Sequence, residues 1–217
     1  YKLFGGSVIN MAINLYQHIE LRTHDDMWAY SNHSFPSDAD PSLFYEILKK
    51  YGRNGMHLTR VISTFDGFMN AGLGSSGSAA VCLIGVLRKE QNKPLDRLDI
   101  AKEAYDIEVK KLKWDGGRQD QYAAAFGGLN LIELGKDMSI MQFMKHKAER
   151  LKKWMLLFYT GSRKTTSNKI QKGFEKLSEK QKKTLDSIKT KTYEAEVYIE
   201  QGDFNEFGLL MNDVWEL

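Results

Sequence analysis

A run of glycines and serines at residues 71–80 constrains the fold of this chain more than any other part of its sequence. It reads Ala-Gly-Leu-Gly-Ser-Ser-Gly-Ser-Ala-Ala and lies between an expected strand at His57–Phe65 and an expected apolar helix at Ser78–Glu90. The first amides of a helix lack partners within it, its dipole places partial positive charge there, and glycines let the backbone approach an anion closely. The run therefore predicts a phosphate-binding site.

Other folds also contain glycine-rich turns, and the residues of this run also match the dinucleotide-binding fingerprint Gly-x-Gly-x-x-Gly. A Rossmann unit needs a second strand that ends in an acid about 20 residues on, but residues 95–113 read as a helix that contains Asp96 and Asp99. The Gly-Lys-[Ser/Thr] of a P-loop and the motifs of protein kinases are absent. A purely structural helix cap stays open, although residues 72–77 hold more glycine and serine than a cap requires.

A glutamate interrupts the apolar face of the helix expected at 95–113. The residues of this face follow steps of three and four, and they are Leu98, Ala101, Tyr105, Glu108 and Leu112. Buried charge is costly unless it is paired or binds a metal, and Mg²⁺ is commonly held by one or two carboxylates with substrate phosphates. Glu108 is therefore a candidate magnesium ligand, and a salt bridge to Lys111 or to a distant lysine is the alternative.

An aspartate, Asp120, follows Gly116-Gly117-Arg118-Gln119 and opens the short helix expected at Gln119–Phe126. As a functional residue it would orient an attacking hydroxyl and take up its proton, while Arg118 would add positive charge near a transferred phosphoryl group. Aspartate is also a common N-cap residue, so helix capping is the alternative.

The rest of the chain mixes strands and helices without regular alternation, which favours an α+β fold. Further strands are expected within Ser7–Leu21, at Leu129–Leu134 and at Trp154–Tyr159, and a loop at residues 30–41. Further helices are expected at Ser42–Tyr51, after Pro94 and in the lysine-rich stretch 168–200.

Composition excludes several classes of protein. With 42% hydrophobic residues the 217-residue chain can bury a core, and no apolar run or leader pattern suggests a membrane protein. The single Cys82 excludes a disulfide framework, so a cytoplasmic protein is expected. The net charge is +3, and Lys145–Lys191 holds 15 of the 31 basic residues. We interpret that stretch as a solvated helix surface, with nucleic-acid binding as the minor alternative.

Taken together, the glycine-rich run, Glu108 and the segment Gly117-Arg118-Gln119-Asp120-Gln121 resemble the GHMP kinase superfamily, the group of galactokinase, homoserine kinase, mevalonate kinase and phosphomevalonate kinase. The resemblance implies ATP and Mg²⁺ as cofactors, Ser76 and Glu108 as magnesium ligands, and Asp120 as the catalytic aspartate. The residues that it implies for phosphate binding are Gly72, Leu73, Gly74, Ser75, Ser76 and Gly77.

The same resemblance implies a two-domain fold. Residues 1–150 would form an N-terminal ATP-binding domain related to ribosomal protein S5 domain 2, and residues 151–217 an incomplete ferredoxin-like C-terminal domain. The chain departs from the family pattern where Gly6 runs directly into Ser7, and it ends before the C-terminal glycine-rich motif of the family. A piece of this kind is not necessarily active alone.

Within the superfamily, residues 119–130 and 157–161 are most similar to bacterial kinases of D-glycero-D-manno-heptose 7-phosphate. This implies phosphorylation of the anomeric 1-hydroxyl by ATP. The residues expected near the sugar are Gly5, Gly6, Thr160, Gly161 and Arg163. A galactose, fucose or mevalonate type of kinase, a non-catalytic nucleotide or sugar sensor, and a homodimer stay open.

Overall fold

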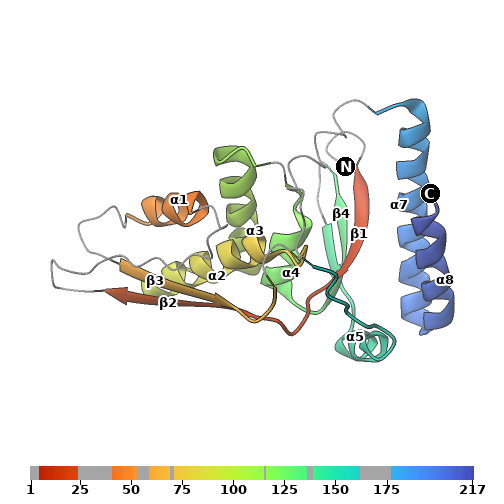
Figure 1. Ribbon diagram of the computed structural model, residues 1–217, viewed down its shortest axis with the longest axis horizontal. Helices are drawn as coiled ribbons and strands as arrows, with labels where there is room; N and C mark the ends of the chain where they lie inside the picture. Colours follow the sequence, from red (N-terminus) through yellow and green to blue (C-terminus); the bar gives the residue numbers. More distant parts are fainter. Residues whose placement is uncertain are drawn as a thin grey trace. The chain divides into compact units, whose positions relative to one another are not determined.

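The computed structural model describes residues 5–23, 41–52, 59–68, 71–114, 116–135, 139–161 and 177–217 (Figure 1). The chain divides into two compact units. One consists of Asn14–Phe126 with Thr160–Asn168, and we call it the 14–126 unit. The other, the terminal unit, consists of Tyr1–Ile13, Gly127–Tyr159 and Lys169–Leu217. Both combine helices with strands, so the expected α+β class is confirmed.

The 14–126 unit packs helices on an antiparallel strand pair. Its strands are β2 (Gln17–Thr23) and β3 (Thr59–Phe65), with Gln17 opposite Phe65. Its helices, in chain order, are α1 (Ser42–Lys50), α2 (Ser75–Glu90), α3 (Arg97–Tyr105), the π-helix η1 (Asp106–Lys111) and α4 (Gln119–Phe126).

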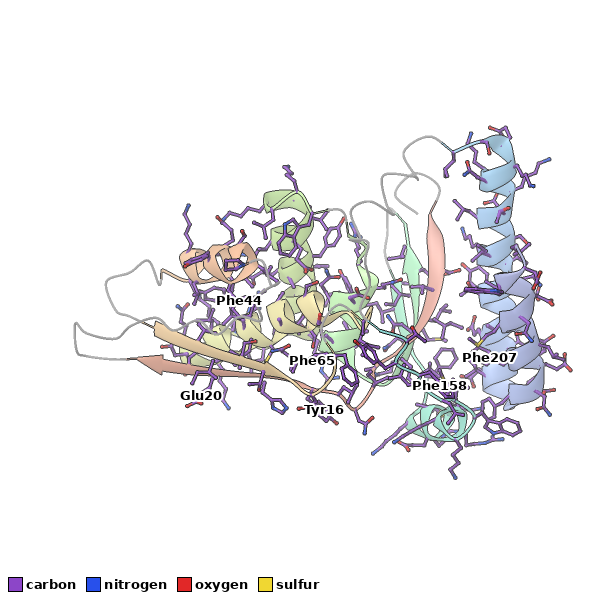
Figure 2. All side chains as sticks on the ribbon, viewed as in Figure 1. Tyr16, Glu20, Phe44, Phe65, Phe158 and Phe207 are labelled. Atoms are coloured by element: carbon purple, nitrogen blue, oxygen red, sulfur yellow. The ribbon has the colours of Figure 1, made fainter. Side chains whose placement is uncertain are left out.

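Helix α2 is the centre of this unit, since β2, α1, α3 and α4 all pack against it. Its apolar residues Ala80, Leu83, Ile84 and Leu87 are fully buried, together with Ile47 of α1. Phe44 on α1, labelled in Figure 2, joins the same core. Alanine at several core positions lets the helices approach closely, which fixes the start of α2 relative to α4.

A buried ionic network ties α3 to α1 and α2. The Glu103 carboxylate pairs with the guanidinium of Arg88 at 2.7 Å and with the ammonium of Lys50 at 2.8 Å, and it accepts a hydrogen bond from the Tyr51 hydroxyl at 3.2 Å. Burial by itself raises the pKa of Glu103, but the hydrogen bonds and charges of Lys50 and Arg88 outweigh it and hold this pKa below its usual value.

We expect Glu103→Ala to lower the free energy of unfolding by about 3–5 kcal/mol, because it leaves the Arg88 charge half-buried without its partner. The depressed pKa gives stability that is present above the unfolded pKa and is lost as the pH falls through the folded pKa. Urea unfolding at pH 7 measures the effect. Lys110→Ala is the control, since it removes only the exposed pair with Asp106 and should change stability by less than about 1 kcal/mol.

The terminal unit is built around a three-stranded antiparallel sheet in the order β1-β4-β5. The strands are β1 (Gly6–Met11), β4 (Leu129–Leu134) and β5 (Ser139–Gln142), and the helices are α5 (Lys145–Lys152), α7 (Glu179–Gln201) and α8 (Phe204–Trp215). Helices α7 and α8 lie side by side (Figure 1). Leu129, Leu131, Leu151, Ile199 and Phe204 belong to the core of this unit.

Much of the lysine-rich stretch is helical, in α5 and in α7. Ser178 and Gln181 form a capping box at the start of α7. Three lysines of this region pair with acids, Lys147 with Glu200, Lys182 with Glu179 and Lys191 with Asp213. These pairs fit the interpretation of a solvated helix surface. Among the described residues, no helix is long and apolar enough to cross a membrane.

Three expectations differ from the structure. Helix α2 begins at Ser75, three residues before the expected start. Pro94 does not open α3, because the side chain of Asp96 accepts a hydrogen bond from the Asp99 amide at 2.9 Å and caps the helix at Arg97. No strand forms at Trp154–Tyr159, where Leu156 is 82% exposed and Phe158 extends from the chain (Figure 2).

The reason for the third difference is that a strand needs a neighbouring strand for its backbone hydrogen bonds, and none of the described residues supplies one to this segment. The expected loop at residues 30–41 and the residues His57 and Leu58 lie outside the described residues, apart from Pro41.

Candidate active site

The glycine-rich run forms the tight turn that leads into α2. Gly74 is the N-cap residue and has the left-handed conformation, with φ 67°, which a residue with a side chain rarely adopts. A glycine cap has no side chain to bond the first amides of the helix, so none of these amides is occupied by the cap residue. The Ser76 side chain is exposed at this end of α2. The expected turn at the start of an apolar helix is therefore present, and anion binding by it stays a prediction.

Asp120 packs directly against this turn. A Cβ atom added at Gly74 would lie 3.0 Å from Cγ of Asp120, and one added at Gly77 would lie 3.1 Å from its Cβ and 3.1 Å from the Gln121 amide nitrogen. Asp120 lies inside the first turn of α4, which begins at Gln119, so it is not the N-cap. The capping alternative is wrong, and the aspartate instead lies beside the glycine turn with its side chain exposed.

Glu108 is buried close to Ser76 of α2 and Gln121 of α4. It is only 4% exposed, it accepts a hydrogen bond from the Gln121 side-chain amide, and it accepts another from the Ser76 hydroxyl. Burial raises the pKa of the Glu108 carboxyl, the nearby Asp120 charge raises it further, and the two hydrogen bonds only partly oppose this. The expected apolar-face position of Glu108 is confirmed.

The salt-bridge alternative for Glu108 is wrong for Lys111, because Lys111 pairs with Glu46 of α1. The acid is held by a neutral amide and a hydroxyl, which do not neutralise its charge. A buried carboxylate without a positively charged partner would be stabilised by a bound cation.

The backbone around Glu108 is a π-helix rather than the expected α-helix. The amide of Leu112 bonds the carbonyl of Ile107, five residues back, over a distance of 3.0 Å. Within this wider turn, Glu108 accepts its hydrogen bond from Gln121 in the first part of α4. Single-turn π-helices occur often at functional sites.

Arg118 stands just before α4, with its guanidinium carbon 4.8 Å from the centre of the Tyr105 ring. Such a contact is worth about 0.5–2 kcal/mol and fixes the side chain against α3. A role of Arg118 at a transferred phosphoryl group stays a prediction.

The residues expected near a sugar are divided between the two units or lie outside the described residues. Gly5 and Gly6 belong to the terminal unit, where Gly6 pairs with Leu134 at the start of β1. Thr160 and Gly161 follow the exposed apolar segment after α5, and Arg163 lies outside the described residues. Sugar binding by these five residues therefore stays a prediction. The motif gave no role to Gln121, which is buried in the cluster. The feature that distinguishes this residue is a buried amide side chain on a short helix.

We expect Gly77→Ala to weaken nucleotide binding and to lower the melting temperature, since its methyl group would meet the backbone of α4 at 3.1 Å. Gly85, a second glycine of α2, offers a matched control, because a Cβ added there meets no atom within 4 Å. Gly85→Ala should stabilise the chain by up to about 1 kcal/mol through helix propensity. Thermal unfolding and ATP titration of both variants check this, and equal effects would contradict the close packing of α2 on α4.

Comparisons with known proteins show which superfamily this chain resembles in sequence and in fold. Residues 42–128 match the model of the GHMP kinases N terminal domain, a stretch that contains the glycine turn, Glu108 and Asp120. The resemblance to the GHMP kinase superfamily is confirmed, and the chain has the α+β GHMP kinase fold.

The proteins to which the chain is similar include heptose phosphate kinases. The chain is 26% identical, over 98% of its length and 69% of the relative, to the D-glycero-alpha-D-manno-heptose 7-phosphate kinase of Campylobacter jejuni. It superposes with a TM-score of 0.75 and 25% identity on a D-glycero-D-manno-heptose 1-phosphate kinase from Bacteroides thetaiotaomicron, covering 99% of this chain and 71% of the other. A mevalonate kinase shares the fold, with a TM-score of 0.68 and 18% identity over 99% and 73% of the two chains.

Proposed function

We propose that the chain is the nucleotide-binding part of an ATP-dependent kinase that phosphorylates a hydroxyl group of a sugar or sugar phosphate. One observation carries the proposal: Asp120 packs against the glycine turn at the start of α2, while the buried Glu108 bonds Ser76 of the same turn. An anion-binding turn, a candidate base and a candidate cation ligand thus meet in one unit.

The residues of this cluster fit Mg²⁺ and the phosphates of ATP. The donors are carboxylate and hydroxyl oxygens, which Mg²⁺ prefers, and Glu108 lacks a positive partner among the described residues. No group of three or more acidic, cysteine or histidine ligands occurs in the described part of the chain. This agrees with a cation that takes most of its ligands from water and phosphate. Ser76 and Glu108 would hold it, and when bound it would neutralise charge on the phosphate oxygens.

The chain's own residues supply positioning and proton transfer. The backbone amides of residues 72–77 bind the phosphates at the positive end of the α2 dipole. The Asp120 carboxylate, next to that turn, orients the acceptor hydroxyl and takes up its proton as the new phosphate ester forms. Arg118 contacts Tyr105, and its guanidinium would stabilise the negative charge of the phosphoryl group during its transfer from ATP to the acceptor hydroxyl.

The substrate that we propose is D-glycero-D-manno-heptose 7-phosphate, with transfer to its anomeric 1-hydroxyl. The support is the printed activity of the Campylobacter jejuni relative and its match over nearly the whole chain. We further propose that residues 1–150 form the ATP-binding domain and residues 151–217 part of the second domain. A cytoplasmic location and a homodimer remain predictions.

A coupled assay of ADP release tests the proposal on the full-length protein. The acceptors are heptose 7-phosphate, free heptose, galactose, fucose and mevalonate, each with Mg-ATP. Turnover on the heptose phosphate supports both chemistry and substrate, whereas turnover on another acceptor keeps the chemistry and overturns the substrate. Binding of Mg-ATP without turnover on any acceptor would contradict a sugar kinase.

A further inference from the structure

The side chain of Gln121 makes a buried contact that the proposed chemistry does not yet use. It lies on α4, the residue after Asp120, and is 4% exposed. Its amide donates a hydrogen bond to Oε2 of Glu108. Its carbonyl oxygen, Oε1, is buried and has no hydrogen-bond partner within the described part of the chain.

This orientation of the carboxamide follows from chemistry. If the group were reversed, its oxygen would face the Glu108 carboxylate, and two acceptors would meet without a proton between them. When Nε2 of Gln121 donates to Glu108, Oε1 of the same carboxamide is left without a donor among the described residues. A buried acceptor without a donor costs about 1–3 kcal/mol, so the arrangement is unfavourable for stability alone.

Resting on the function proposed above, we propose that Gln121 is a positioning residue for the cation that Glu108 would hold. Its amide fixes one Glu108 oxygen, and its carbonyl oxygen accepts a hydrogen bond from a water bound to the cation. Both bonds are of the kind that metal sites use. Ligating carboxylates are normally hydrogen-bonded by a second layer of residues, and waters on Mg²⁺ can only donate.

The same contacts explain why the amide is suited to this position. A carboxylate at 121 would repel Glu108, and an ammonium would neutralise it and compete with the cation. A glutamine holds the acid without removing its charge, so the charge stays available for the metal. Gln121 thus acts through Glu108 and through water.

The test measures cation binding directly and needs no sugar. Mn²⁺, which stands in for Mg²⁺, is titrated into the protein with saturating ADP, and free Mn²⁺ is followed by electron paramagnetic resonance. Gln121→Met keeps the length of the side chain and loses both polar groups. We expect its Kd for Mn²⁺ to rise by about 10–100-fold, the usual effect of removing a residue that supports a metal ligand.

A matched control removes a glutamine with a purely structural bond. Gln91 donates its side-chain amide to the Tyr51 carbonyl oxygen at 3.0 Å in the same unit. Gln91→Met should lower the melting temperature and leave the Kd for Mn²⁺ within about two-fold of wild type, since it touches no residue of the cluster. If Gln121→Met does not fold, Gln121→Asn retains an amide that is one methylene too short, and the same loss of affinity is expected.

Glu108→Gln is the positive control and should abolish Mn²⁺ binding in the same assay. If the Kd for Mn²⁺ of Gln121→Met then stays within two-fold of wild type, the inference is overturned and the kinase proposal is left intact. Failure of the wild-type protein to bind Mn²⁺ with ADP would instead contradict the proposed function, and with it the role of Gln121. A weaker Kd in Gln121→Met with an unchanged Kd for metal-free ADP is the expected result.

Discussion

Replacing Asp120 by asparagine is expected to lower kcat by about 10²–10⁴-fold, the contribution of a positioned general base, while the Kd for Mg-ATP stays within a few-fold of wild type. Asparagine has the same shape, so the close contacts of this side chain with Gly74 and Gly77 are retained. What is lost is the negative charge that would accept the proton of the acceptor hydroxyl. Steady-state kinetics on the active sugar and ATP titration measure the two quantities.

Asp99→Asn is the control for this variant. Asp99 is an exposed acid in the first turn of α3, in the same unit, so its replacement changes the net charge equally without touching the glycine turn. Its kcat should equal that of wild type. Equal kcat in Asp120→Asn and wild type would remove Asp120 from the mechanism. Mg-ATP binding by the wild-type protein without any turnover would instead favour a nucleotide sensor.

Replacing Glu108 by glutamine should have opposite effects on function and on stability. The Mg²⁺ concentration for half-maximal activity should rise by at least about 100-fold, because a charged ligand is lost and each 1.4 kcal/mol is worth a factor of ten. The melting temperature without metal should rise, by about 2–4 °C for each kcal/mol gained, since burial disfavours the charged carboxylate.

The pH dependence gives this prediction a definite sign. The pKa of Glu108 is raised in the folded protein, so the folded state binds a proton at a pH where the unfolded state has lost it. The destabilisation is therefore absent below the unfolded pKa and develops as the pH rises through the folded pKa. The difference in melting temperature between Glu108→Gln and wild type should grow from acidic to neutral pH. A constant difference would contradict a buried, ionised Glu108.

The parts of the site that the sequence predicted are those that depend on local chemistry. A strand, a run of small residues and an apolar helix predict an anion-binding turn wherever they occur in this order. Glu108 could be singled out because an acid on an apolar face needs a reason to be there. Helix α4 and strand β4 begin and end where expected, because Gly127 and Gly128 separate them clearly.

The parts that the sequence did not predict depend on contacts across the fold. The π-helix at Asp106–Lys111 has residue types that also occur in α-helices, so the sequence pattern does not distinguish the two. Gln121 belongs to the motif, but its bond to Glu108 is a contact between two helices that the sequence alone does not show. The extended segment Trp154–Tyr159 has strand-forming residues, yet residue type alone does not provide a neighbouring strand.

The measurement that tests the central claim most directly is ³¹P NMR of the full-length protein with Mg-ATP and heptose 7-phosphate. The account predicts that the γ-phosphate signal of ATP declines while a second phosphate ester appears on the sugar, and that Asp120→Asn prevents both changes. Loss of ATP with only inorganic phosphate as product, or an unchanged spectrum across every sugar of the panel, would contradict phosphoryl transfer to a sugar hydroxyl.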